Sequence, residues 1–310
     1  MIIVISGPTG VGKTALSMEI AEHYDVEIIS GDSMQVYKGM DIGTAKISTD
    51  EQGKVSHHMI DIITPEDSFS VADYQSAVRD RIEAIEKRGR IPLIVGGTGF
   101  YIKSVLHDYR FEGKASSDAF EKAHEDKTPM ALYNALKTQN PDAAKSVHPH
   151  NRKRVLRTLE KVQSGSFASG EAKGHIPKYD YLLITLTMER SVLYERINTR
   201  VDKMIKEGLL DEANELWHRD IAKTAKNAIG YKELFEYFDG TISLEEAINR
   251  IKQNTRRFAK RQITYFKHQF NPHWFNVGEH AFETTVKDVL SLIDTTLETA
   301  RMTELRDPLS

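Results

Sequence analysis

The chain has 310 residues, of which 40% are hydrophobic and 28% charged, values ordinary for a globular protein with a sizeable core in one or two domains. Its formal net charge of −3 at pH 7 excludes a generally basic protein, so any nucleic-acid-binding surface must be local. The lack of cysteine excludes disulfides, thiolate catalysis and cysteine-ligated zinc. No basic leader or long apolar segment precedes the first apolar run, so we expect a cytoplasmic protein without a membrane span.

The first motif lies between an apolar run, Ile2–Ile5, and a helical pattern, Ala15–Tyr24. It fits G-x-x-x-x-G-K-[ST] at every fixed position, and its residues are Gly7, Pro8, Thr9, Gly10, Val11, Gly12, Lys13 and Thr14. Glycines let backbone N–H groups curl inward, and these donors with the helix N-terminus form a nest for phosphate oxygens. Lys13 adds a mobile positive charge, and the Thr14 hydroxyl is a candidate Mg²⁺ ligand. The motif predicts binding of a di- or triphosphate without naming the reaction.

Short apolar runs separated by helical patterns predict an α/β fold with a doubly wound parallel sheet. The helical patterns include Val71–Arg88, and the predicted strands are Ile2–Ser6, Glu27–Ser30, His58–Ile62, Ile91–Val95 and Tyr181–Leu186. Ligands of such sheets bind beyond the carboxyl ends of the strands. We therefore expect a P-loop core over residues 1–110 and 178–310, with a site at those ends.

Between Phe111 and Pro177 the sequence becomes polar and helical, which predicts a helical insertion domain over residues 111–177. Within it, Gly165–Gly174 is interpreted as a loop. After the last predicted strand the chain is expected to be helical from Arg190 to about Phe270, and the residues from Met302 onward are expected to form a frayed end.

Two polar clusters follow predicted strands and are candidates for the site. Ser33, Met34, Gln35 and Tyr37 follow Asp32, whose carboxylate could act as a general base or hold Mg²⁺ through water. Capping of a helix is the alternative for Asp32. The second cluster, Gly96–Tyr101, permits close backbone approach to a ligand; Thr98 either donates a hydrogen bond there or caps the next helix.

Two basic clusters lie on predicted helices. One contains Lys153, Arg154 and Arg157; the other contains Arg257 and Arg261 beside aromatic residues, a combination suited to an RNA backbone and unstacked bases. A solvated helix face is the alternative for each cluster. Arg196 and Arg200 follow the fifth predicted strand, where arginines often cover phosphates.

Taken together, these clusters resemble bacterial tRNA dimethylallyltransferases, the isopentenyltransferase family. The matching segments run in family order along nearly the whole chain: Gly7–Thr14, Asp32–Tyr37, Lys38–Lys46, Gly96–Tyr101, Arg200–Met204 with Gly208-Leu209, Ala228–Glu233 and Thr255–Gln262. The phosphate loop alone is common to many families, whereas the complete set is specific.

The resemblance implies transfer of a dimethylallyl group from dimethylallyl diphosphate to the exocyclic amine of the adenosine 3′ of the tRNA anticodon, assisted by Mg²⁺. It implies that Lys13, the loop amides, Mg²⁺ near Thr14 and Arg200 take up charge on the leaving diphosphate. Asp32 would accept a proton from the amine, and Thr98 would be a further catalytic residue in contact with the target nucleotide. The implied tRNA contacts are Asp32, Ser33, Met34, Gln35, Thr98, Lys153, Arg154, Arg157, Arg257 and Arg261.

The chain departs from the family pattern in its insertion. Many relatives begin the insertion helix with Pro-Gln-Arg where this chain has Arg152-Lys153-Arg154, and Phe120 and Glu121 stand where relatives often carry an arginine. The chain also lacks the cysteines of the eukaryotic zinc finger.

Three other functions share the phosphate loop: an adenylate isopentenyltransferase, a small-molecule kinase and a nucleotide-dependent RNA-binding switch without catalysis. The basic clusters favour tRNA over the first two, and Asp32 beside the phosphate loop counts against the third. The sequence leaves open which tRNAs are used, whether ATP also binds, and the oligomeric state, a monomer included.

Overall fold

The structure is a computed structural model that describes residues 1–111, 118–165, 167, 176–278 and 282–306. It divides into two compact units, one formed by Met1–His107 with Pro177–Ser310 and the other by Asp108–Ile176. Among the described residues, no helix combines the length and apolar character needed to span a bilayer.

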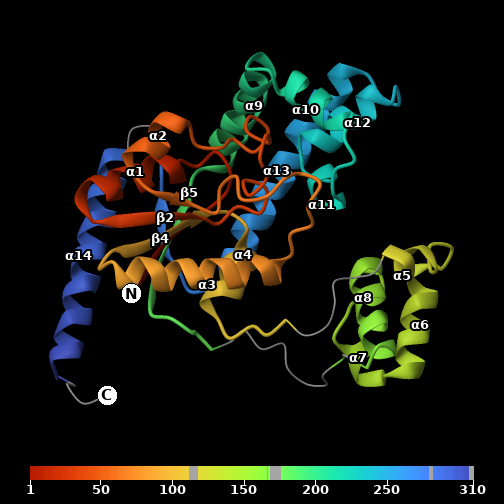
Figure 1. The fold of residues 1–310 in the computed structure, drawn as a ribbon, viewed down its shortest axis with the longest axis horizontal. Helices are drawn as coiled ribbons and strands as arrows, with labels where there is room; N and C mark the ends of the chain where they lie inside the picture. Colours follow the sequence, from red (N-terminus) through yellow and green to blue (C-terminus); the bar gives the residue numbers. More distant parts are fainter. Residues whose placement is uncertain (112–117, 166, 168–175, 279–281, 307–310) are drawn as a thin grey trace. The chain divides into compact units, whose positions relative to one another are not determined.

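The larger unit is built on one parallel sheet of six strands in the order β3-β2-β4-β1-β5-β6 (Figure 1). The strands are β1 (Ile2–Ser6), β2 (Val26–Ser30), β3 (His57–His58), β4 (Ile91–Gly96), β5 (Tyr181–Thr187) and β6 (His273–Asn276). β1, β2 and β5 are buried along all or nearly all of their length because helices cover both faces of the sheet. The predicted α/β class with a parallel sheet is thus confirmed.

The strand predicted over His58–Ile62 is wrong beyond its first residue. Met59 and Asp61 have φ values of 63° and 54°, in the left-handed region, which ends the extended conformation after His58. No predicted strand corresponds to β6, which is short and mostly exposed. The predicted frayed end is wrong as far as Arg306, because the backbone there continues a helix, α14 (Phe282–Arg306).

Alternate residues of the central strands point to opposite faces, and each face is packed by its own helices. Ile3 and Ile5 belong to a core shared with α1 (Lys13–His23), α9 (Arg190–Lys206) and α14. Ile2 and Val4 belong to a second core shared with α3 (Val71–Lys87) and α4 (Gly99–Leu106). A short helix, α2 (Thr49–Lys54), precedes β3.

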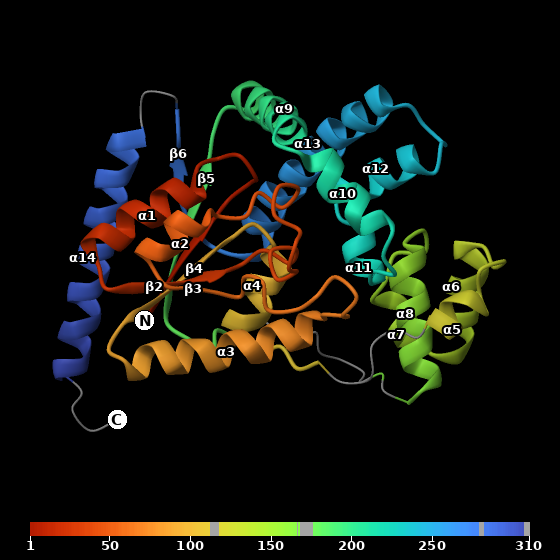
Figure 2. The same cartoon turned by 45° about the horizontal axis from the view of Figure 1, so that its top comes forward.

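The remaining helices of this unit gather around a third core (Figure 2). They are α10 (Leu209–Trp217), α11 (Lys223–Lys226), α12 (Tyr231–Phe238) and the long α13 (Leu244–Gln269). Val36, Tyr37 and Met40, which follow β2, pack into the same core. The segment after β2 is therefore held between the sheet and these helices.

The smaller unit has a helical core of its own. Its helices are α5 (Asp118–Lys122), α6 (Pro129–Gln139), α7 (Pro141–Lys145) and α8 (Arg152–Gln163). Two of them begin with proline at the first helical position, preceded by the capping side chains of Thr128 and Asn140. Except for residues 165 and 167, the loop predicted over Gly165–Gly174 lies outside the described residues.

A buried carboxylate on β2 ties together three segments of the larger unit. The Glu27 side chain is 3% exposed and accepts hydrogen bonds from Arg88 (2.7 and 2.9 Å) and Arg90 (3.2 Å). Its Oε2 also lies 2.6 Å from Nε2 of His58. The Arg88 hydrogen bond, supported by His58 and Arg90, outweighs burial and lowers the pKa of Glu27 to about 2.

We expect Glu27→Gln to lower the free energy of unfolding by about 3 kcal/mol near neutral pH. Because the folded-state pKa is depressed, this contribution is complete above the ordinary value of 4.5 and is lost as pH falls toward about 2. The free energies of unfolding of the two proteins, measured by urea titration, should therefore converge over that pH range. Asp25→Asn, at a carboxylate 72% exposed, is the control with little effect. A difference in the free energy of unfolding that does not change with pH would contradict the lowered pKa of Glu27.

Candidate active site

A cavity of about 790 Å³ lies at the carboxyl ends of β1, β2 and β4, where a parallel sheet of this type binds its ligands. Segments distant in sequence contribute to its wall, and the lining residues include Lys13, Asp32, Gln35, Gly97, Arg200 and Gln262. All of them belong to the larger unit.

The phosphate loop joins β1 directly to α1. Gly12 precedes the helix with a φ of 106°, a left-handed conformation that favours glycine. A Cβ on Gly7 would stand 2.5 Å from the carbonyl oxygen of Leu186, so the loop can approach β5 only without a side chain there. The Lys13 ammonium donates to the carbonyl oxygens of Gly7 (3.0 Å) and Pro8 (2.8 Å). The Lys13 side chain thus folds back and binds the backbone of its own loop.

Three of the charged groups that line the cavity, Lys13, Asp32 and Arg200, have pKa values that burial shifts in the direction favouring the uncharged form. Burial and the nearby Arg200 lower the pKa of Lys13 to about 8. Burial also lowers the pKa of Arg200, partly opposed by Asp32. The pKa of Asp32 is raised by burial, which outweighs the Met34 amide and the two cations. An anionic ligand beside Lys13 and Arg200 would compensate their burial.

The polar segment after β2 is shaped by its own side chains. Oδ1 of Asp32 accepts a hydrogen bond from the Met34 amide (2.8 Å) in a local turn, so the carboxylate caps no helix. Oγ1 of Thr98 accepts from the Ser33 amide (3.3 Å). Thr98 precedes α4 but makes no side-chain capping bond to it. The structure therefore brings Asp32, Ser33 and Thr98 together and does not support the capping alternatives.

Sequence reasoning missed the role of Gln262, a buried side chain on α13. Its Oε1 accepts a hydrogen bond from the Thr9 amide in the phosphate loop (3.0 Å), and the side chain is 5% exposed. A Cβ on Gly97 would lie 2.0 Å from Nε2 of Gln262. A glutamine in a basic helix carries no local signal of such a contact.

The basic residues lie on two helices outside this cavity. Arg257 and Arg261 are exposed on α13, where they line a more open hollow of about 610 Å³ with Tyr265. Lys153 and Arg154 are exposed on α8 of the smaller unit. Arg157, on the same helix, pairs with Glu160 at 2.8 Å. Arg200 lines the cavity, whereas Arg196 does not. The RNA contacts of these residues stay predictions.

The donor set of the cavity fits a magnesium ion carried by a bound diphosphate. Within the described residues, no group of three or more His, Cys, Asp or Glu side chains could hold a metal ion. Mg²⁺ usually keeps several waters and needs only one or two protein oxygens beside substrate phosphates. The Thr14 hydroxyl is exposed in the cavity wall, and no hydrogen bond within the described residues occupies it. Thr14 is therefore available as such a ligand.

The sheet, the phosphate loop and the partly buried carboxylate facing it are the features of a P-loop α/β protein, a class whose glycine loop binds di- or triphosphates. A family model described as IPP transferase matches residues 35–269. The chain belongs to this family.

Individual relatives match nearly the whole chain. The tRNA dimethylallyltransferase of Bacillus pumilus is 50% identical over 284 residues, covering 89% of each chain, and that of Bacillus subtilis is 48% identical. A crystal structure of the full-length tRNA isopentenylpyrophosphate transferase from Bacillus halodurans matches with a TM-score of 0.76 at 43% identity and covers 98% of both chains. A eukaryotic dimethylallyltransferase acting on tRNA matches with a TM-score of 0.80 at 27% identity, covering 97% of this chain and 79% of its own.

The lowered pKa of Lys13 predicts how anion binding depends on pH. Inorganic diphosphate should bind the Lys13→Met variant about 10–10²-fold more weakly near pH 7, because a charged hydrogen bond is lost. Since only the ammonium form attracts the anion, this ratio should shrink as pH rises above about 8. Calorimetric titrations of both proteins at each pH give the ratio, which cancels the titration of diphosphate itself. A ratio that stays constant to about pH 10 would contradict the assignment.

Proposed function

We propose that this chain transfers the dimethylallyl group of dimethylallyl diphosphate to the exocyclic N6 of the adenosine 3′ of the anticodon in tRNA and releases diphosphate. The observation that carries the proposal is the arrangement of the cavity. A phosphate nest with Lys13 and Arg200 shares it with a partly buried carboxylate, Asp32. The family of this chain and its relatives, which include enzymes named for this reaction, support the same conclusion.

The reaction needs one base and one anion-binding site. The N6 nitrogen forms a bond to the first carbon of the dimethylallyl group, and the bond from that carbon to the diphosphate oxygen breaks. Diphosphate leaves with the electron pair, and the proton of the amine passes to Asp32. A placed base of this kind typically contributes about 10²–10⁴-fold.

The loop amides, Lys13 and Arg200 stabilise the charge that grows on the departing diphosphate. Donors already oriented toward developing charge are commonly the largest catalytic contribution. Mg²⁺, when bound with the diphosphate, neutralises part of that charge. Thr14 would supply a protein oxygen to the ion.

The nucleobase reaches this cavity only after leaving the stack of the anticodon loop, at a cost of a few kcal/mol. We propose that Asp32, Ser33, Met34, Gln35 and Thr98 receive the extruded base. The exposed cations on α13 and α8 (Arg257, Arg261, Lys153 and Arg154), together with Arg157, would hold the RNA around it, through phosphate contacts and stacking.

The experiment that tests this function is incubation with unmodified tRNA, Mg²⁺ and labelled dimethylallyl diphosphate, followed by nuclease digestion. The expected result is label in a single modified adenosine from the anticodon loop. Parallel reactions with AMP and with labelled ATP identify an adenylate isopentenyltransferase or a kinase. Label in AMP alone, or phosphate transfer from ATP without tRNA labelling, would overturn the proposal.

Replacement of Asp32 should separate catalysis from RNA binding. We expect Asp32→Ala to reduce the turnover number by at least about 10²-fold because no group accepts the amine proton. In the native enzyme the raised pKa of Asp32 places the acid limb of the pH–rate profile above the range of an ordinary aspartate. Single-turnover rates and filter binding of tRNA provide the two measurements. Near-native turnover, or loss of tRNA binding equal to the loss of rate, would argue against a general base.

A further inference from the structure

The side-chain amide of Gln35 is held in one orientation at the wall of the cavity. Its Nε2 faces the carbonyl oxygens of Thr44 (3.3 Å) and Ala45 (3.5 Å), which can only accept. Its Oε1 accepts a hydrogen bond from the Ser30 hydroxyl (2.8 Å), and that hydroxyl accepts from the Asp32 amide (3.3 Å). The amide of Gln35 and the backbone of the proposed base are thus linked by a directed series of hydrogen bonds.

The backbone of Gln35 is held from the other side by the segment after β3. The amide of Asp61 donates to the carbonyl oxygen of Gln35 (3.1 Å). Two segments therefore enclose Gln35: residues 44–45 fix its side chain, and Asp61 fixes its main chain.

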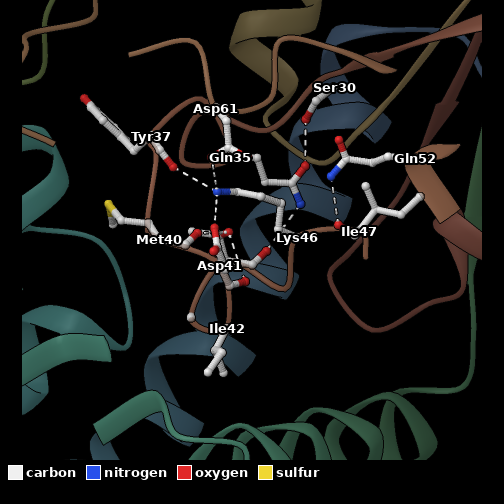
Figure 3. A network of polar contacts seen from close by, with 12 residues as sticks. Ser30, Gln35, Tyr37, Met40, Asp41, Ile42, Lys46, Ile47, Gln52 and Asp61 are labelled. Atoms are coloured by element: carbon white, nitrogen blue, oxygen red, sulfur yellow. Dashed lines mark hydrogen bonds and ion pairs between the residues drawn. The ribbon is translucent and has the colours of Figure 1, made fainter. Parts of the chain in front are cut away.

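Lys46 joins these two segments (Figure 3). Its ammonium contacts Oδ1 of Asp61 at 2.6 Å, donates to the carbonyl oxygen of Tyr37 at 2.9 Å, and contacts the carboxylate of Asp41. The Lys46 side chain is 4% exposed, and its three N–H donors meet three oxygens. The result is a closed ring that runs from Gln35 through Asp61 and Lys46 to the Ala45 carbonyl and back to Gln35.

Backbone strain accompanies this ring. Ala45 and Asp61 both have positive φ, 49° and 54°, although neither is glycine. Such conformations are disfavoured and persist where the surroundings enforce them, often at functional sites. Backbone hydrogen bonds from the amides of Ala45 to Ile42 (3.0 Å) and of Lys46 to Asp41 (2.9 Å) close the turn at Ala45, and the Lys46 ammonium links this turn to Asp61.

We propose that Lys46 is a positioning residue for the acceptor nucleobase, which acts through Gln35 and makes no contact with the leaving diphosphate. By fixing the carbonyls of Thr44 and Ala45, it keeps Nε2 of Gln35 turned away from the base. The remaining lone pair of Oε1 is then left for a donor in the cavity, and the exocyclic amine of adenosine is such a donor. The proposal rests on the function proposed above.

The test is a double-mutant cycle with Lys46→Met and Gln35→Met in the full-length chain. Each single variant should lower the turnover number about 10–10²-fold, the size expected when a reactant is misplaced by about 1 Å. Because Lys46 acts through Gln35, the double variant should be no slower than the slower single variant. The dissociation constant for inorganic diphosphate should stay within about twofold of wild type in all three, since the phosphate nest is not part of the ring.

Two controls separate positioning from stability. Lys54→Met removes an exposed lysine on α2 and should leave turnover unchanged. Thermal melts identify variants that fail to fold; if Lys46→Met is one of them, Asp61→Asn takes its place in the cycle. That substitution weakens the bond to Lys46 but keeps the Asp61 amide that holds Gln35.

The outcomes are distinct. Non-additive losses of turnover with unchanged diphosphate binding support the inference. Losses that multiply, or a loss of diphosphate affinity, would overturn it and leave Lys46 as a structural ion pair. A wild-type protein that does not transfer the dimethylallyl group to tRNA refutes the proposed function itself, before the variants are compared.

Discussion

The hydrogen bond from the Thr9 amide to Oε1 of Gln262 joins the phosphate loop to a helix 253 residues further along the chain. The bond fixes one loop amide and therefore the direction in which the neighbouring amides face. It requires α13 to approach the turn after β4, and Gly97 allows this because a Cβ there would collide with the glutamine. The proposed anion nest thus depends on a contact between distant parts of the larger unit. The chain leaves this unit at His107 and returns at Pro177, two residues paired by a β-bridge, so the smaller unit is inserted without interrupting the sheet.

The charged side chains in the cavity favour the binding of an anion. Lys13 and Arg200 repel each other and are both desolvated, and the nearby Asp32 compensates only part of this cost. A diphosphate would bind the two cations, whose attraction for it is strengthened by the low dielectric constant of a buried site. Its negative charge would in turn raise the proton affinity of Asp32, which favours a carboxylate that takes up a proton as the bond to diphosphate breaks. The same burial that disfavours the charged forms of Lys13 and Arg200 therefore favours both halves of the proposed reaction.

Parts of the site carried by contiguous residues could be predicted from the sequence. The phosphate loop is one, because its glycines and Lys13 act within a single turn, and Asp32 is another, because it follows a clear apolar strand. The length predicted for β3 is too great because nothing in the sequence signals that Met59 and Asp61 adopt left-handed conformations. Gln262 was missed because its function comes from a contact across the fold rather than from a pattern along a helix.

The helices around α12 show why the site extends beyond its cavity. Glu212 on α10 accepts hydrogen bonds from the amides of Asp41 (2.9 Å), Ile42 (2.8 Å) and Gly43 (2.9 Å). The Tyr231 hydroxyl donates to the same carboxylate (2.6 Å), and a Cβ on Gly43 would lie 2.5 Å from the tyrosine ring. This loop leads directly into the carbonyls that hold Gln35. One end of the 41–46 segment is therefore anchored on helices that supply no proposed catalytic residue, and the other end orients a side chain in the cavity. A change at Glu212 would reach Gln35 through the backbone of this loop, so α10 and α12 support the proposed site.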